Sequence, residues 1–187
     1  LWKSDGSADG TVMVKDINAG AADSSPSYLA VIGSTLYFQA GDAATGFELW
    51  RSDGSAESTV MVKDINLGAT SSTPSYLAAA GSTLYFQATD GLLGSELWKS
   101  DGSASGTVMV KDINLGASSS SPSYLAAIGT SIYFQAGDGL VGSELWKSDG
   151  SAESTVMVKD INLGAGSSSP SYLAAVGSTL YFQAGDG

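Results

Sequence analysis

The stretch Glu96-Leu97-Trp98-Lys99-Ser100-Asp101-Gly102-Ser103 decides the fold, because it recurs along the chain at a fixed interval. Residues 49–96 and 97–144 are identical at 37 of 48 positions, so the repetition extends to everything between the motifs. The chain is one unit of 48 residues written four times, and repeats of this length are typical of stacked or radially arranged units. The tryptophan of the motif occurs at Trp2, Trp50, Trp98 and Trp146.

The repeat from Pro74 to Ser121 contains four segments with strand character. Residues 75–80 form a short apolar run that ends at Gly-Ser, and residues 83–88 alternate between two faces and are rich in aromatics. Residues 96–100 and the β-branched run 107–113 follow, each after a loop marked by glycine. Short strands joined by such turns predict a four-stranded antiparallel sheet. A four-stranded unit of 40–50 residues is the size of a β-propeller blade.

The predicted fold is therefore all-β: a β-propeller of four-stranded antiparallel blades, with four 48-residue repeats in a single domain over residues 1–187. Helical repeats need longer amphipathic segments, and leucine-rich repeats are shorter than 48 residues. The blade units are expected at 26–68, 74–116 and 122–164, with a fourth blade split between 170–187 and 1–20.

The two ends of the chain are complementary in the repeat. Leu1–Ser4 corresponds to the third strand of a blade, and Thr179–Ala184 corresponds to the second strand. Pairing of these ends within one chain would close a ring of four blades, whereas pairing between two chains would give an eight-bladed dimer. The sequence leaves both open, and the complementary phase within one chain favours the closed monomer. Four times 48 residues would be 192, so we interpret the chain as a segment or processed form of something longer.

Composition narrows the function classes. Apolar residues make up 43% of the chain, enough for a core, and no apolar run approaches the 18 or more residues of a membrane span. Nineteen acidic against eight basic residues give a net charge of −11, which disfavours nucleic acid and anionic membranes as partners. The sequence has no cysteine and no histidine, so disulfides, thiolate chemistry, Ser–His arrangements and imidazole-ligated metals are excluded.

The motif resembles the bacterial ELWxxDGT repeat, and the match covers the whole chain. Glu48–Ser55, Glu96–Ser103 and Glu144–Ser151 carry it, and Leu1–Ser7 carries it without the glutamate; serine replaces the last threonine in every copy. The downstream Gly106–Ile113 also fits the repeat. This family occurs in tandem in large, mostly secreted proteins, so the resemblance implies a β-repeat protein with an extracellular or cell-surface location. It implies no catalytic residue.

The tryptophans have two interpretations. They could be platforms that stack on carbohydrate, or large core side chains that hold one blade against the next. The second is favoured because Trp98 lies inside a predicted strand, where a plausible register places it opposite Met109. The same register would place Glu96 opposite Lys111 as an ion pair.

Two sets of acidic residues need a role. The first set precedes glycine in a tight turn, where Asp commonly accepts bonds from nearby backbone N–H groups, so turn capping is favoured over ligand binding. This set comprises Asp5, Asp53, Asp101 and Asp149. The second set lies in the loop between the second and third strands, and asparagines lie in the loop between blades. In a propeller these loops share a face, where their oxygens could bind Ca²⁺, although an EF-hand pattern is absent and ordinary turn roles are favoured. These are Asp42, Asp90, Asp138 and Asp186, with Asn18, Asn66, Asn114 and Asn162.

Near-identical units present the same surface several times, which suits multivalent contact better than catalysis. The sequence thus predicts a non-catalytic extracellular structural or adhesive module that needs no cofactor. The alternative is a lectin-like propeller with one equivalent sugar site per blade, helped by calcium, whose partner is a glycan on a cell surface. A carboxylate-pair glycosidase ranks last, because the acids of one blade recur in the others.

Overall fold

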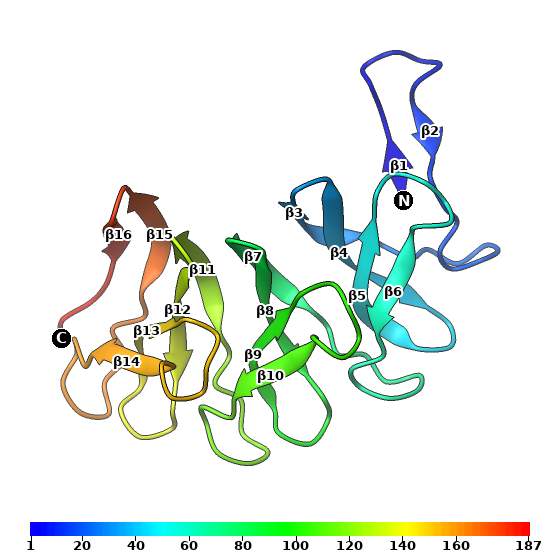
Figure 1. Cartoon of the computed structure of the whole chain (residues 1–187). Helices are drawn as coiled ribbons and strands as arrows, with labels where there is room; N and C mark the ends of the chain where they lie inside the picture. Colours follow the sequence, from blue (N-terminus) through cyan, green and yellow to red (C-terminus); the bar gives the residue numbers. More distant parts are fainter.

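The computed structural model describes all 187 residues, Leu1–Gly187, and contains strands but no helix. No helix is therefore present that could cross a membrane. Three antiparallel sheets of four strands make up most of the molecule (Figure 1). The first comprises β3 (Ser27–Ile32), β4 (Thr35–Asp42), β5 (Gly46–Ser52) and β6 (Val60–Lys63). The second comprises β7 (Ser75–Ala80), β8 (Thr83–Thr89), β9 (Ser95–Ser100) and β10 (Val108–Lys111). The third comprises β11 (Ser123–Ile128), β12 (Ser131–Gly137), β13 (Ser143–Ser148) and β14 (Val156–Lys159). The prediction of an all-β chain of repeated four-stranded antiparallel sheets is confirmed.

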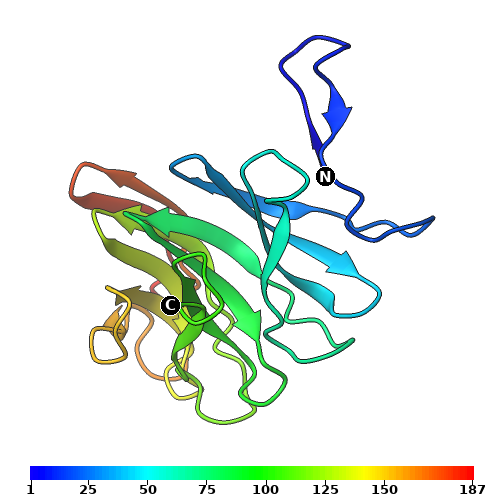
Figure 2. The same cartoon turned by 45° about the vertical axis from the view of Figure 1, so that its right-hand side comes forward.

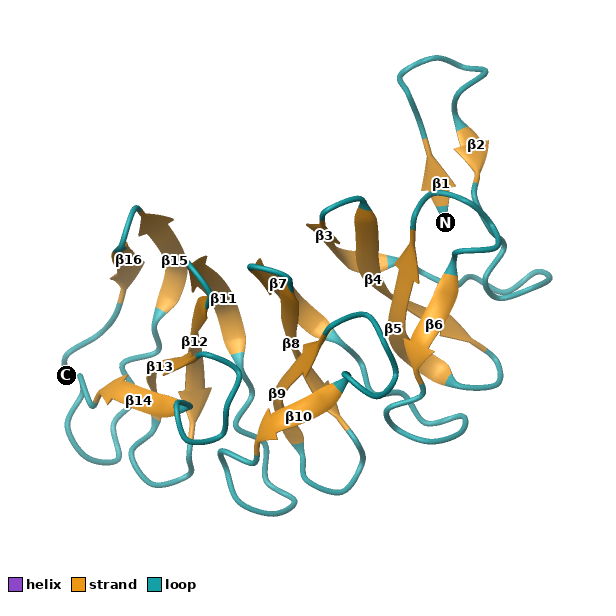
Figure 3. Ribbon diagram, in the orientation of Figure 1, coloured by secondary structure: helices purple, strands orange, loops and turns teal.

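Each end of the chain carries half a sheet. β1 (Trp2–Lys3) pairs only with β2 (Val12–Met13), and β15 (Ser171–Val176) pairs only with β16 (Thr179–Gln183). Figure 3 shows the two halves at opposite ends of the row of sheets. The pairing of 170–187 with 1–20 within one chain, which the sequence favoured, is therefore not found. The reason is geometric, because three complete sheets stand between the halves.

The sheets stand side by side in an arc (Figure 2). Their first strands β3, β7, β11 and β15 contact one another in series, whereas the fourth strands make no comparable contacts. The first strands are therefore on the inside of the arc and the fourth strands on the outside. The first strands carry the Tyr-Leu-Ala run, whose small alanine side chains suit this crowded inner position.

A two-residue turn joins the first and second strands of each sheet. In the second sheet this turn is Gly81-Ser82, and Gly81 has φ +62° while Ser82 does not have a positive φ. Positive φ at the first turn residue only is the pattern of the type II′ hairpin, whose twist suits flanking strands. Glycine is the residue that adopts this conformation without steric penalty.

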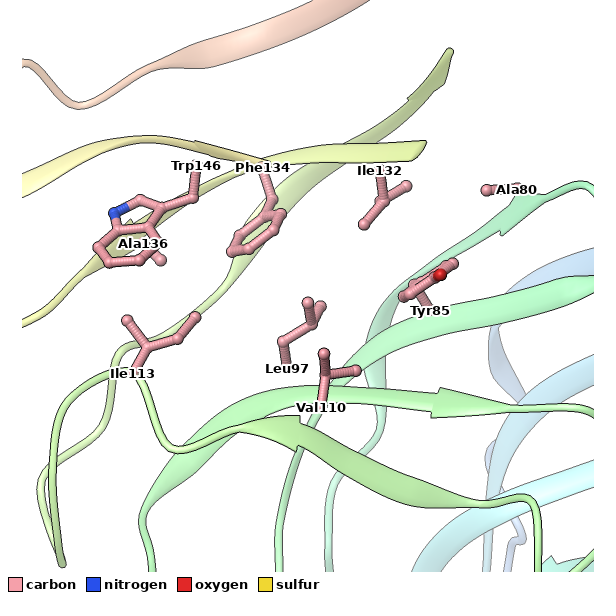
Figure 4. Close-up of a cluster of buried hydrophobic side chains, with 9 residues drawn as sticks. All are labelled: Ala80, Tyr85, Leu97, Val110, Ile113, Ile132, Phe134, Ala136 and Trp146. Carbon is pink, nitrogen blue, oxygen red and sulfur yellow. The ribbon is translucent and has the colours of Figure 1, made fainter. Parts of the chain in front are cut away.

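The hydrophobic core lies between the sheets. In Figure 4, Phe134 and Trp146 of the third sheet face Leu97 and Val110 of the second. An equivalent cluster joins the first and second sheets, and a smaller one joins the N-terminal half to the first sheet. Each sheet thus buries one face against the unit before it and the other against the unit after it.

Trp98 belongs to this core, as predicted. Its side chain is only 6% exposed, it lies opposite Met109 in the register, and the ammonium of Lys63 lies 5.9 Å from its ring centroid. Trp2 differs, since the N-terminal half has no neighbour on its other side and leaves this tryptophan 66% exposed.

The predicted ion pair between Glu96 and Lys111 is wrong. A bulge between Met109 and Lys111 shifts the register, so Lys111 lies opposite Leu97 instead. The Lys111 ammonium donates a hydrogen bond of 2.8 Å to the carbonyl of Thr155 in the next sheet. Lys15 and Lys63 reach the following sheet in the same way, so these lysines link neighbouring units rather than strands within a unit.

Candidate functional site

The loops at the lower edge of the sheets form one face of the molecule (Figure 1). They are the loops between sheets and the loops between the second and third strands of each sheet. Gly91 packs so closely on Asn66 that an added Cβ would lie 2.7 Å from the Asn66 Oδ1, and Gly139 stands in the same relation to Asn114. The structure therefore brings the predicted asparagines and the loops of the predicted aspartates together. We call this surface the loop face.

The aspartates on the loop face hold their own loops. The Asp90 Oδ1 accepts hydrogen bonds from the N–H groups of Leu92 and Leu93, at 2.8 and 2.9 Å, and Asp138 holds its loop in the same way. In Asp42, burial alone would raise the pKa, but bonds from Thr45 and Ala44 outweigh it and the pKa is lowered. Asp186 is exposed at the end of the chain.

The asparagines on the loop face also bond to the backbone of their own loops. The Asn66 Nδ2 donates to the carbonyl of Ser71 at 3.0 Å, and Asn114 donates to Ser119 at 3.0 Å. Asn18 and Asn162 make the corresponding bonds at 3.3 Å. The structure contains no group of three or more acidic side chains close enough to hold a metal ion. Apart from the exposed Asp186, the carboxylate and amide groups proposed for Ca²⁺ thus bond to local backbone groups in the present arrangement.

Leucines form the most prominent feature of the loop face. Leu67, Leu115 and Leu163 occupy equivalent positions next to the asparagines and are 82–83% exposed. Leu92 and Leu140, in the other loop class, are exposed as well. An open depression of about 320 Å³ lies among these loops, lined by residues that include Asn114, Gly139 and Leu140. Three of the four inter-sheet loops therefore present an exposed leucine, and a shallow polar hollow lies beside the loops that carry Asn114 and Leu140.

The first set of aspartates, those that precede glycine, lies away from the loop face, in the turns between the third and fourth strands. The Asp101 Oδ1 accepts bonds from the N–H and the hydroxyl of Ser103, at 2.8 and 2.7 Å. Hydrogen bonds from serine lower the pKa of this carboxyl and of its three counterparts. These exposed carboxylates cap their turns. The counterparts are Asp5, Asp53 and Asp149.

The tryptophans are not placed to stack on a sugar. Trp50, Trp98 and Trp146 are 6–7% exposed, and the indole N–H of each is buried without a hydrogen-bond partner. Their ring faces lie in the clusters between sheets, among residues such as Leu49, Phe86 and Ile113. Only Trp2, in the unpaired N-terminal half, is open to solvent.

Sequence reasoning missed a row of tyrosines on the inner strands. Tyr28, Tyr76, Tyr124 and Tyr172 follow one another with ring centroids 6.1, 6.1 and 6.2 Å apart and ring planes inclined by 44°, 45° and 46°. Each has a positive φ of 52–55°, which is rare for a bulky side chain, at a bulge in the first strand. Such outliers cluster at functional sites. The signal in the sequence is the Pro-Ser-Tyr tripeptide that opens every repeat.

A buried carboxylate was also misassigned. Glu96 is fully buried, and its two oxygens accept bonds from the N–H of Ile113, the N–H of Ser120 and the hydroxyl of Ser120, at 2.9, 2.8 and 2.6 Å. Burial raises the pKa of Glu96 more than these bonds lower it. The same clamp occurs at Glu48 and Glu144, so the glutamate of the motif fixes the loop that leads to the next sheet.

Comparison with known proteins shows similarity of structure but gives no family. No protein-family model and no curated protein matches the chain. Among solved structures, the crystal structure of the computationally designed Ika8 protein is similar, with a TM-score of 0.50 and 13% sequence identity. The similarity covers 85% of this chain and 42% of the designed chain, so this chain spans about two fifths of that protein's length. At this identity the likeness concerns the fold alone.

Proposed function

We propose that the sheets are blades of a β-propeller and that the chain serves as a non-catalytic structural or adhesive module outside the cell. The observation that carries this proposal is the repeated set of exposed leucines on the loop face, above all Leu67, Leu115 and Leu163. A leucine that is more than four fifths exposed gains free energy when a partner removes it from water. Repetition of the same tip along the arc suits weak contacts that add up by multivalency.

The bonds made by the repeated acids also support a non-catalytic role. The aspartates of both sets cap turns or loops, and the motif glutamates clamp backbone groups, so the repeated acids already have structural partners. The extracellular location rests on the resemblance to the ELWxxDGT repeat. The net charge of −11 favours solubility, which suits a protein that displays apolar tips.

The experiment measures adhesion force between an immobilised chain and an alkane-terminated surface, with a hydroxyl-terminated surface as reference. Leu67→Ser, Leu115→Ser and Leu163→Ser are combined one, two and three at a time. We expect the force to fall with each substitution while the melting temperature stays the same. Val108→Ser with Val156→Ser, which changes exposed apolar residues on the outer strands, is the matched control and should leave the force unchanged. Equal forces for the triple variant and the parent would refute the adhesive role.

A lectin-like function is the second candidate, and the inner tyrosine row favours it. Tyr76 and Tyr124 expose about two fifths of their surface, and aromatic rings combine an apolar face with a polar tip, which suits sugars. A glycan array probed with and without calcium distinguishes the two functions. If the chain binds one sugar class, and the Tyr76→Ala, Tyr124→Ala double variant does not, the lectin-like function would be favoured over the adhesive one.

A further inference from the structure

We propose that two copies of the chain close into a ring of eight blades, in which β1–β2 of each copy completes the half-sheet β15–β16 of the other. This assembly goes beyond the proposed function and does not depend on what the loops bind. It rests on three observations: two sheet edges are unpaired, successive units are related by a rotation, and side chains at the two ends are exposed although the equivalent side chains of interior repeats are packed against a neighbouring unit.

The internal repeats supply the register of the missing contact. In the second sheet, Phe86 of β8 lies opposite Trp98 of β9, and Tyr85 lies opposite Lys99. The first and third sheets have the same register. Transferred by 96 residues in each direction, the same pairing would join β16 of one copy to β1 of the other as Leu180–Ser4, Tyr181–Lys3, Phe182–Trp2 and Gln183–Leu1.

The side chains at these edges are exposed, although their counterparts are core residues. Phe182 is 37% exposed against 0% for Phe86, and Trp2 is 66% exposed against 6% for Trp98. Unpaired edge strands with apolar side chains are templates for pairing with another chain. Because both partners of the interior pair are present at the two ends, a second copy is the occupant that fits both edges.

The number of units follows from the tyrosine row. A rotation inclines a plane by no more than its own angle, so inclinations of 44°, 45° and 46° require about 45° or more per unit and allow at most eight units in a full turn. A ring of four is also excluded, because β15 would then contact β3 as β3 contacts β7, and no comparable contact exists. Each chain contributes four units. Eight is the one multiple of four that lies above four and within the limit, so the ring holds two copies.

Lysines provide an independent check at the same boundary. The ammonium groups of Lys15, Lys63 and Lys111 each donate to a threonine carbonyl of the next unit, at 2.7–2.8 Å. Lys159 is the fourth lysine of this series, and it is exposed. In the proposed ring its acceptor is the carbonyl of Thr11 of the second copy, so closure completes the series.

The first test is the mass of the full chain in solution. Sedimentation or light scattering should give twice the chain mass of 18.9 kDa. Trp2→Ala should raise the dimer dissociation constant by about a hundredfold or more, since a core tryptophan is lost at each of two seams. Quenching of tryptophan fluorescence by iodide provides a second measurement of the same equilibrium. The dilute monomer should expose one tryptophan of four, and the concentrated dimer none. A chain that remains monomeric at all soluble concentrations overturns the proposal.

The second test determines the register by disulfide formation. The chain has no native cysteine, so any disulfide must join the introduced residues. Lys3→Cys with Tyr181→Cys places the two sulfurs directly opposite each other across the seam, within reach of a disulfide. The oxidised product should be a dimer on a non-reducing gel. Lys3→Cys with Leu180→Cys is the control and should not cross-link, because adjacent side chains point to opposite faces of a strand. A ladder of higher oligomers would mean an open array, and cross-linking of the control would mean a different register; either result refutes the ring.

Discussion

Replacing Glu96 with alanine should test whether the motif glutamate, rather than the tryptophan alone, holds neighbouring units together. The substitution leaves two buried backbone N–H groups, those of Ile113 and Ser120, without an acceptor. Each orphaned donor costs about 1–3 kcal/mol, and relief from burying a carboxylate offsets part of this. We expect the free energy of unfolding to fall by about 2–4 kcal/mol, a large share of the roughly 5–15 kcal/mol of a typical domain.

The assay is urea unfolding followed by tryptophan fluorescence, with Glu153→Ala as the matched control. Glu153 is exposed, so its loss should change stability by less than about 0.5 kcal/mol. A double-mutant cycle with Ser120→Ala locates the effect, because both substitutions remove the same short bond of 2.6 Å. We expect the losses to be non-additive. A stable Glu96→Ala variant, or strictly additive losses, would show that the clamp contributes nothing.

Three further predictions follow from packing, backbone conformation and titration. Trp98→Ala should lower the free energy of unfolding by about 3–5 kcal/mol, measured by urea unfolding, and a loss below about 1 kcal/mol would contradict its core position. Gly116→Ala should cost about 1–2 kcal/mol through its φ of +84° alone, whereas Gly94→Ala should cost more, because its Cβ would also lie 2.4 Å from a backbone oxygen; equal melting temperatures would contradict this. Burial raises the pKa of Glu48 and Glu96, so the native state binds protons more tightly than the unfolded state. Stability should therefore increase as pH falls from neutral through their folded pKa values to the ordinary glutamate pKa of 4.5, measured by melting temperature, and a steady decrease over that range would refute it.

Interactions within a hairpin could be predicted from the sequence. The pairing of Trp98 with Met109 follows from the short turn between their strands, and the glycine punctuation gives the four strands of each unit. The register after Met109 could not be predicted, because a bulge depends on local backbone geometry that apolar alternation does not encode.

Contacts between loops and between units could not be predicted from the sequence pattern. Glu96 reaches Ser120 across 24 residues, and the relevant signal, a serine at the same position in every repeat, indicates neither partner nor burial. The left-handed backbone of Tyr76 is equally hidden, since tyrosine is an unusual residue for that conformation. The failure of the ends to meet within one chain depends on the angle between units, which is a property of packing rather than of strand pattern.

The position of the core between units has a consequence for how the chain folds. Each apolar cluster is shared by two neighbours, so an isolated unit cannot complete its core, and every unit offers the same two faces. Since neighbouring units are identical at most positions, a newly formed second unit has little chemical basis for telling the first unit from the third. Docking in the wrong order is a characteristic failure of repeat proteins. Synthesis from the N-terminus, which releases one unit at a time, restricts each unit to the neighbour that has already emerged.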